Sequence, residues 1–470
     1  MIQKKTIHYA IFTLLSIIWL GFCLTFLVPQ FRIQYLGLAQ KFLDSFGKFI
    51  SQDRIEKSIT MASFLGIAFY FLVLFLLFLE NFIINSENFK KLNLRFLFIS
   101  IISILAIIIR IAGFGQITGD FNTQSEWVTY LRNNRHFFGF NNFPGNYNAI
   151  YMYFLGILSY LPISAELFAM KFISCIFDFL CAYYSLKILE LISGNKKIGI
   201  IAFTVILFSP TVFLNSGVWA QCDSMYASFL LISLYYLLKT KFRLAMIMYG
   251  IGFSFKLQAV FMLPFIIFIF IYKKTSLKYF LFILIGLIAV SIPAWLFGWP
   301  LIRIFYNYFA GTNINGVLTL NAPTIFIWGQ IPGMIPVIFI LSVLICIGFL
   351  IIHSQSIPSH NTLLLLFLFC NFVIPFFLPN MHERYFYVGE IAVLLYIIIN
   401  PARFLIAVAV IFPAMVTYVN YLWHTNSFTL LQMSVIMLIA VIFITKWLIE
   451  SITADQKSVL VKNFNADKLC

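Results

Sequence analysis

Residues 279–297 read YFLFILIGLIAVSIPAWLF, an unbroken stretch without a charged side chain. A helix of about 20 apolar residues crosses the hydrocarbon core of a bilayer, so this stretch predicts a transmembrane helix. The whole chain has the same character: 62% of its 470 residues are hydrophobic and 10% are charged, whereas soluble domains carry about 25% charged residues. The composition therefore predicts an all-α integral membrane protein and excludes an ordinary soluble enzyme.

Similar apolar stretches recur along the chain and predict a multi-span bundle of about 12 to 14 transmembrane helices. The expected spans are 7–28, 61–83, 96–113, 167–191, 197–213, 223–238, 243–255, 257–272, 279–297, 334–352, 361–378, 385–400, 404–421 and 429–447. Short basic clusters lie between these spans, and such clusters mark the cytoplasmic side of a membrane protein. The net charge of +15 is explained in this way and does not indicate a nucleic-acid partner.

The basic clusters also predict which connections face outward. With the N-terminus inside, the long connections 30–60, 114–166 and 298–333 all fall on the extracytoplasmic side. The apolar stretch 147–161 is too short to cross, and part of 30–60 is amphipathic, so both are expected to be interfacial helices on that side. The working surface of the protein is therefore expected to face out of the cell.

Four segments are expected from the pattern of spans. They are 1–95, a pair of spans with an interfacial helix; 96–400, the transmembrane core; 401–450, the C-terminal spans; and 451–470, a polar cytoplasmic tail. The seven cysteines form no C-x-x-C pattern, so they predict neither a disulfide framework nor a metal site.

Two polar clusters interrupt the first long outer connection of the core. GDFNTQSEW at 119–127 places Asp120 where a span ends and a surface helix begins, together with Glu126. Asp120 is either a helix cap or a general base that takes a proton from a hydroxyl group. GNYN at 145–148 contains Asn146, which either forms a turn or binds a sugar by hydrogen bonds.

A third cluster joins two spans on the same side. NSGVWAQCDSMY at 215–226 brings together an aromatic face and hydrogen-bonding groups suited to a sugar, namely Trp219, Gln221 and Asp223, although Asp223 is also placed to cap a helix. Farther along, Lys256 and Gln258 interrupt two short apolar helices, where a lysine faces an anion or reaches the interface. Lys171 and Asp178 share one face of the span 167–191, and Asp178 is expected to be structural.

The fourth cluster is PNMHERY at 379–385, a short outer turn between two spans. His382 and Arg384 are expected to hold a phosphate and to stabilise its developing charge, while a solvated, salt-bridged turn containing Glu383 is the alternative. The pair His-Glu lacks the second histidine of H-E-x-x-H, so a metalloprotease is excluded. Asn321 lies at an expected helix start in the outer stretch 319–323.

Together these clusters indicate a transferase that takes its donor from the membrane. No P-loop and no dinucleotide-binding fingerprint is present, and no nucleotide is available outside the membrane. A donor carried on a lipid phosphate would place its phosphate near Lys256, His382 and Arg384. Direct displacement with Asp120 as base would invert the anomeric centre.

The clusters also resemble a known family. GDFNTQSEW, GNYNAIY, LNSGVWAQCDSMY, FSFKLQAVFMLP, LTLNAP and FLPNMHERYFY, all within about 114–390, resemble bacterial mannosyltransferase-like membrane proteins of the GT-C class, which are related to the second mannosyltransferase of GPI-anchor assembly. The sequence departs from the related motif W-G-Q-x-D, because Ala220 stands in place of glycine.

The resemblance implies a GT-C-type bundle whose segment 96–400 is the catalytic core, in the bacterial cytoplasmic membrane. It implies an inverting enzyme with a polyprenyl-phosphate sugar as donor, mannose or glucose as the sugar, and a glycan or lipid-linked acceptor. It also implies Asp120 as base and K-x-Q and H-E-R motifs at Lys256, Gln258, His382, Glu383 and Arg384.

Three other functions are considered. A transporter or flippase of a lipid-linked or polar substrate is the strongest alternative, although polar groups would then be expected near the bilayer midplane and in repeated halves. A polysaccharide ligase or polymerase would carry a large late loop, whereas the late connections of this chain are short. A non-catalytic scaffold would leave the motifs GDF at 119–121 and HER at 382–384 unexplained. No cofactor is required by the pattern, and a divalent cation such as Mg²⁺ or Mn²⁺ on Asp120 with Glu126 or Asp223 stays open.

Overall fold

The computed structural model describes residues 92–145, 147–300, 318–329, 332–354, 358–425 and 428–467. The predicted spans 7–28 and 61–83, the predicted interfacial helix within 30–60 and Asn146 lie outside these residues. The chain divides into two units, Met1–Phe98 with Val419–Ser427, and Ile99–Tyr418 with Phe428–Cys470. The second, larger unit carries the predicted site residues.

The described residues are mostly helical and include only two short strands. In chain order the first half contains α4 (Leu92–Ala112), α5 (Gly119–Asn133), η2 (His136–Asn142), α6 (Ala149–Leu158), η3 (Ile163–Ala165), α7 (Glu166–Ser193), α8 (Lys196–Phe208), α9 (Pro210–Phe213), η4 (Leu214–Val218), α10 (Asp223–Leu238), α11 (Phe242–Phe255), η5 (Leu257–Met262) and α12 (Leu263–Tyr272). The second half contains η6 (Leu277–Phe280), α13 (Leu281–Leu296), β1 (Thr319–Leu320), η7 (Ile325–Trp328), α15 (Met334–Ser354), α16 (His360–Leu368), η8 (Phe369–Val373), α17 (Ile374–Phe376), β2 (Met381–His382), η9 (Glu383–Phe386), α18 (Tyr387–Ile399), η10 (Pro401–Arg403), α19 (Leu405–Trp423) and α20 (Leu430–Asp467).

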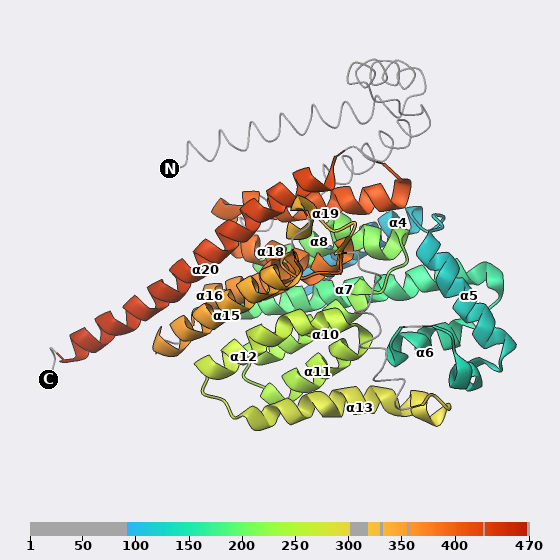
Figure 1. Ribbon diagram of the computed structural model, residues 1–470, viewed down its shortest axis with the longest axis horizontal. Coiled ribbons are helices and arrows are strands. Elements are labelled where there is room, and N and C mark those ends of the chain that lie inside the picture. Colours follow the sequence, from blue (N-terminus) through green and yellow to red (C-terminus); the bar gives the residue numbers. More distant parts are fainter. Residues whose placement is uncertain are drawn as a thin grey trace, which may run out of the picture. The chain divides into compact units, whose positions relative to one another are not determined.

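The central helices of the larger unit lie side by side. α10 packs against α7 and α11, and α11 packs in turn against α13 (Figure 1). Two glycines allow the last of these contacts, because a Cβ atom at Gly250 or Gly286 would lie 2.3 Å from a backbone oxygen of the facing helix. Small residues let membrane helices approach closely, and here they bring α11 and α13 together along their length.

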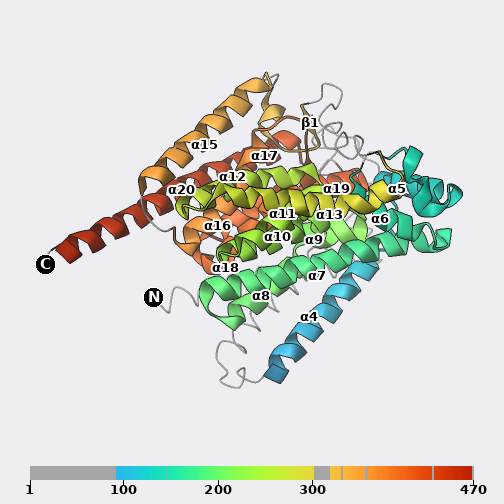
Figure 2. The ribbon, with the colours of Figure 1, turned by 90° about the horizontal axis from the view of Figure 1, so that it is seen from below.

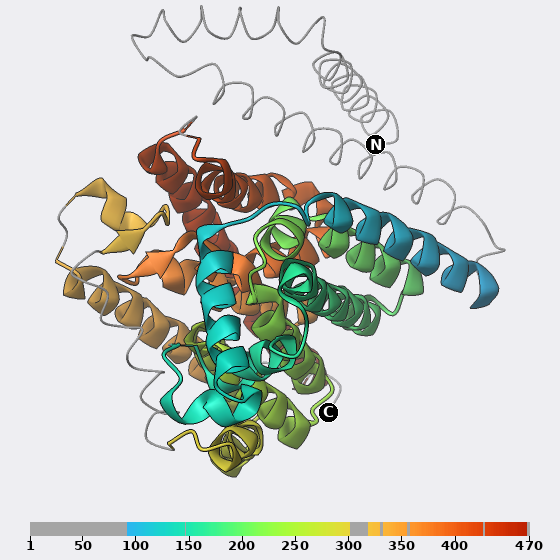
Figure 3. The ribbon, with the colours of Figure 1, turned by 90° about the vertical axis from the view of Figure 1, so that its right-hand side faces the viewer.

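The shorter helices α5 and α6 gather at one end of these long helices. Figure 2 shows both of them near the start of α7, and Arg132 of α5 donates to Glu166, the first residue of α7, at 2.5 Å. Viewed from that end, α5 (cyan) crosses in front of the ends of the longer helices (Figure 3). The predicted surface stretch 147–161 forms α6, which packs on α5, α11 and α13.

Every span predicted beyond residue 95 coincides with a helix or with a broken pair of helices. Among the described residues five helices are long and apolar enough to cross a membrane, and a sixth span results if Lys196–Phe208 and Pro210–Val218, bent by 50°, are counted together. The apolar part of α4, Leu97–Ala112, and the helices at the other predicted spans are shorter than 18 residues. These findings identify a helical, multi-pass membrane protein.

The described part of the polar tail, 451–467, is helical, which the sequence did not predict. α20 continues through the expected boundary at residue 450 and ends at Asp467. The stretch 451–467 contains no glycine or proline to stop a helix. Asp455 also fixes this part of α20 to α16, because its carboxylate accepts from the backbone N–H of Ser359 at 2.9 Å and from the hydroxyl of Thr362 at 2.5 Å.

Candidate functional site

The turn that precedes Asp120 is held by a buried lysine. Lys171 of α7 donates from Nζ to the carbonyl oxygens of Gly113, Phe114 and Gln116, at 3.0, 3.0 and 2.6 Å. These carbonyls follow the C-terminal end of α4, where a cation is favoured by the helix dipole and by unpaired acceptors. The turn between α4 and α5 is thus fixed from the interior of the bundle.

Thr118, and not Asp120, caps α5. The Thr118 hydroxyl accepts from the backbone N–H of Phe121 at 3.2 Å and donates to the carbonyl oxygen of Trp219 at 3.3 Å. Asp120 therefore lies in the first turn of α5 with its carboxylate free for other contacts. This arrangement removes the helix-cap alternative that the sequence left open for Asp120.

The Asp120 carboxylate receives three donors on a single oxygen. Oδ2 accepts from Trp219 Nε1 at 2.7 Å, from Gln221 Nε2 at 2.6 Å and from Arg384 Nη1 at 3.3 Å. No described residue donates a hydrogen bond to Oδ1. Because the Asp120 side chain is 32% exposed, one oxygen is held in place by the protein while the carboxylate stays open to an incoming molecule.

An unusual backbone turn delivers Trp219 and Gln221 to the same carboxylate. The π-helical turn η4 ends at Val218, and Ala220 then takes φ of +66°, in the left-handed region that favours glycine. Trp219 and Gln221 flank Ala220, and both side chains reach Asp120. Strained turns of this kind occur at functional sites, where surrounding contacts hold them in place.

A buried ion pair contacts this turn and stabilises it. Arg110 of α4 donates from Nε to Asp178 of α7 at 2.8 Å, and the Ser216 hydroxyl donates to the same carboxylate. Both charged residues are almost fully buried. A Cβ atom at Gly217 would lie 3.1 to 3.2 Å from atoms of Arg110, so glycine allows η4 to approach the pair closely.

A second buried ion pair lies near Asp120 and its donors. Lys256 donates from Nζ to Asp223 Oδ1 at 2.6 Å, and Asn215 donates from Nδ2 to Asp223 Oδ2 at 2.9 Å. Lys256 lies in an extended break between α11 and η5, with its Nζ 5.8 Å from the centre of the Tyr147 ring. Asp223 thus serves as a charge partner rather than as a helix cap, and the Lys256 charge is already balanced.

The turn that carries His382, Glu383 and Arg384 is fixed by a short strand pair. β2 pairs in parallel with β1, the N–H of Asn380 donates to the carbonyl oxygen of Leu318 at 2.8 Å, and Asn321 bridges to His382. Asn321 and Asn380 both have positive φ, which asparagine tolerates better than most residues. This pairing aims Arg384 at Trp219, with the guanidinium carbon 5.4 Å from the ring centre.

The two other ionisable residues of this turn have shifted pKa values. Burial, assisted by the neighbouring charges of Arg384 and Lys256, lowers the pKa of His382 to about 4, so this imidazole is neutral near pH 7. Burial raises the pKa of Glu383 to about 7, although Arg384 opposes the shift. His382 can therefore donate or accept a hydrogen bond near neutral pH but brings no charge.

The Asp120 cluster consists of Asp120, Trp219, Gln221, Asp223, Lys256 and the turn with His382, Glu383 and Arg384. The other predicted site residues differ in whether they contact this cluster. Gln258 is partly buried in η5 and Glu126 is exposed on α5, and neither forms a hydrogen bond or ion pair with the described residues of the cluster. Asn321 donates from Nδ2 to the carbonyl oxygen of Thr417 at 3.1 Å, so its amide positions the strand pair. Asn146 is not described.

Three residues with clear roles were not among the predicted site residues. Arg110, Asn215 and Tyr147 contact Asp178, Asp223 and Lys256, respectively. An arginine inside the apolar span 96–113 was a signal that could have identified Arg110, because such residues are costly unless paired. Within the described ranges, no three His, Cys, Asp or Glu side chains gather as a metal site.

Two carboxylates of the cluster form ion pairs with different cations. Asp120 faces Arg384 at the more exposed position, and Asp223 faces Lys256 in the interior. Arg384 also keeps a buried Nε without a hydrogen-bond partner among the described residues. An anion that reached Arg384 would find an unused donor there and would compete with Asp120 for the guanidinium.

No family model matches the chain. No curated protein matches it either.

Proposed function

We propose that this protein is a GT-C-type glycosyltransferase of the bacterial cytoplasmic membrane, built from about 12 to 14 spans with its active site on the extracytoplasmic side. It transfers a hexose, mannose or glucose, from a polyprenyl phosphate to a glycan or a lipid-linked acceptor, with inversion. The observation that carries the proposal is the Asp120 carboxylate, which is held through Oδ2 by three donors while its other oxygen is open.

The geometry suits Asp120 as a general base. As the acceptor oxygen bonds to the anomeric carbon, its proton passes to Asp120 Oδ1, and the bond between that carbon and the phosphate oxygen breaks. The electron pair leaves with the phosphate. A base in this position contributes about 10²- to 10⁴-fold to the rate.

Arg384 is the group best suited to the leaving phosphate. It lies next to Asp120 and over the Trp219 ring, and its buried Nε has no hydrogen-bond partner among the described residues. His382 joins it as a neutral hydrogen-bond donor, since its lowered pKa of about 4 removes the positive charge. Lys256 stabilises the charge on the leaving phosphate electrostatically while it remains paired with Asp223.

The remaining predicted residues have proposed roles in orientation and binding. Trp219 and Gln221 contact the base directly, so in this proposal they orient it as well as the sugar. The sequence also predicts that the sugar or the acceptor is contacted by Glu126, Asn146, Gln258, Asn321 and Glu383, and this stays part of the proposal.

A transporter or flippase of a lipid-linked or polar substrate is the second candidate. Two observations favour it: the bend of 50° between Lys196–Phe208 and Pro210–Val218, and buried ionisable groups within helices of the bundle, among them Arg110, Asp178 and Glu390. Broken helices and buried ionisable groups are typical of transport pathways.

One experiment separates the two functions. The purified protein would be mixed with a panel of polyprenyl-phosphate hexoses, and sugar release or transfer would be followed by mass spectrometry for wild type and Asp120→Asn. Glu450→Gln is the matched control, because it makes the same carboxylate-to-amide change at an exposed position of α20.

If the protein is a transferase, wild type should turn over one of the donors. Asp120→Asn should reduce this turnover by about 10²- to 10⁴-fold without changing donor binding, and Glu450→Gln should be as active as wild type. Binding without turnover in wild type, together with movement of the lipid across vesicle membranes, would replace the transferase with the flippase.

A further inference from the structure

A cavity lies at the end of the bundle opposite the Asp120 cluster. Its volume is about 260 Å³, and it is lined by residues of α10, α12 and α16 and by those that follow or precede these helices. Leu237 and Leu238 stand at the last turn of α10, whereas Asp223 is its first residue, about 22 Å away along the helix. The cavity is therefore separate from the site described above.

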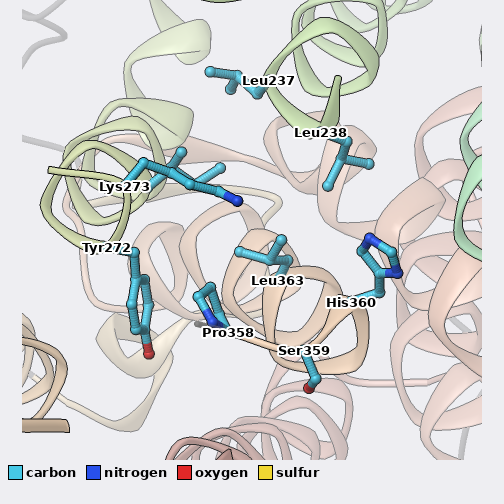
Figure 4. A pocket seen from close by; sticks show the side chains of 9 residues that line it. Leu237, Leu238, Tyr272, Lys273, Pro358, Ser359, His360 and Leu363 are labelled. Carbon is cyan, nitrogen blue, oxygen red and sulfur yellow. The ribbon is translucent and has the colours of Figure 1, made fainter. Parts of the chain in front are cut away.

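The walls of this cavity are mostly apolar. Leu237, Ile269 and Leu363 are buried, and Pro358 closes one side. Figure 4 shows Lys273 extending its terminal nitrogen toward the space bordered by Leu238, Leu363 and His360, while the Ser359 hydroxyl points away from it. The cavity thus combines an apolar interior with a cationic group and an imidazole.

The surrounding sequence is strongly basic. Lys239, Lys241 and Arg243 follow α10, and Lys273, Lys274 and Lys278 follow α12. The sequence contains no aspartate or glutamate between Asp223 and Glu383. The acidic neighbour on α20, Asp455, accepts hydrogen bonds from the backbone of Ser359 and from Thr362, so it is engaged at the start of α16.

We propose that this cavity binds the headgroup of an anionic phospholipid, with its phosphate beside Lys273 and His360 and its acyl chains leaving along the apolar walls. Basic pockets between membrane helices bind anionic headgroups in this way. The adjoining surface is suited to lipid, because Leu277 and Leu281 are 72% and 63% exposed. The volume is below that of pockets for drug-sized ligands, which fits one headgroup.

The apolar walls decide between a lipid and free phosphate. A free phosphate ion would gain nothing from Leu237, Ile269 and Leu363, whereas an amphiphile gains from both the walls and the cation. The proposal depends only on this end of the bundle, so it stands or falls independently of sugar transfer.

The test measures the thermal unfolding midpoint of the purified full chain in a non-ionic detergent. Phosphatidylglycerol, phosphatidylcholine and inorganic phosphate are titrated in parallel. The variants are Lys273→Gln, which removes the charge, and Leu238→Trp, which fills the cavity. Lys274→Gln is the matched control, because Lys274 is exposed and does not line the cavity.

The expected result is a saturable rise of the midpoint with phosphatidylglycerol and none with phosphatidylcholine. Lys273→Gln should need about fivefold more lipid for the same rise, Leu238→Trp should lose the response, and Lys274→Gln should behave as wild type. Equal responses of wild type and Lys273→Gln would overturn the proposal. An equal rise with inorganic phosphate would also overturn it, because the ligand would then be the free ion.

Discussion

Lys256 and Asp223 form an ion pair inside the bundle, with Nζ 2.6 Å from Oδ1 and both side chains largely removed from solvent. From the sequence, Lys256 was expected either to face an anion or to reach the interface, and in the structure the protein itself supplies the anion, Asp223. Asn215 donates to the second oxygen of Asp223, which satisfies the pair further. The pair joins the start of α10 to the end of α11.

Removing one member of this pair is expected to cost more than removing both. Lys256→Met leaves the Asp223 carboxylate buried beside Asn215 alone, so the free energy of unfolding should fall by about 3–5 kcal/mol. In Lys256→Met/Asp223→Asn no buried charge is left unpaired, and part of this loss should be recovered. Denaturant unfolding of the four proteins of this cycle in detergent provides the measurement. Strictly additive losses would contradict the pairing.

Ala220 is predicted to accept glycine at almost no cost in stability. Replacing any buried alanine by glycine removes a methyl group worth about 0.8 kcal/mol and loosens the unfolded chain. At φ of +66°, however, glycine also relieves about 1–2 kcal/mol of backbone strain. Ala220→Gly should therefore unfold within about 0.5 kcal/mol of wild type.

The control for this prediction is Ala227→Gly, at a fully buried position within α10. It loses the methyl group and gains no relief, so its free energy of unfolding should fall by about 1–2 kcal/mol. Equal losses at the two positions would show that the turn at Ala220 is unstrained.

The sequence predicted well where polar side chains would gather. Asp120, Trp219, Gln221 and Arg384 meet although Asp120 and Arg384 are 264 positions apart in the chain. The reason is physical: a charged or amide group in so apolar a chain is costly unless it lies at an interface or finds a partner. Their placement at span ends made a common surface the natural expectation.

The sequence did not predict which residues would pair. Lys171 and Asp178 share a helix face, but seven residues separate them by about 10.5 Å along the axis, too far for an ion pair. Instead Lys171 binds carbonyl oxygens after α4, and Asp178 pairs with Arg110. Helix periodicity gives the face on which a residue lies, whereas tertiary packing selects its partner.

Lys171 is predicted to stabilise the turn that carries Asp120. Lys171→Met removes a donor from three carbonyl oxygens after α4, of which only that of Gly113 keeps another, the N–H of Gln116, and this should lower the free energy of unfolding by about 3 kcal/mol. The backbone amides of residues 113–118 should also exchange faster with deuterium, because the turn loses its anchor. Hydrogen–deuterium exchange with mass spectrometry measures both the place and the size of this change.

Lys187→Met is the matched control on the same helix. Lys187 lies over the ring of Tyr183 at 5.6 Å and is remote from the turn, so its loss should leave exchange at 113–118 unchanged. If both variants increase exchange there equally, the effect belongs to α7 as a whole and Lys171 does not anchor the turn.

His382 and Glu383 are predicted to give opposite pH dependences of stability that largely cancel. The pKa of His382 falls from its usual 6.5 to about 4, so the unfolded chain binds more protons and stability is lost as the pH falls through this window. The pKa of Glu383 rises from its usual 4.5 to about 7, so the folded chain binds more protons and stability is lost as the pH rises. Each slope is at most about 1.4 kcal/mol per pH unit.

The variant Glu383→Gln separates the two contributions. Without Glu383, the free energy of unfolding relative to wild type should increase with pH by up to about 1.4 kcal/mol per unit between pH 4.5 and 7. His382→Asn should show the mirror image, a relative stability that decreases with pH between 4 and 6.5. Denaturant unfolding across this range measures both differences, and contributions from other groups cancel because each variant is compared with wild type at the same pH. If the free energy of unfolding of both variants changes with pH as that of wild type does, the pKa values of His382 and Glu383 are not shifted in the folded protein.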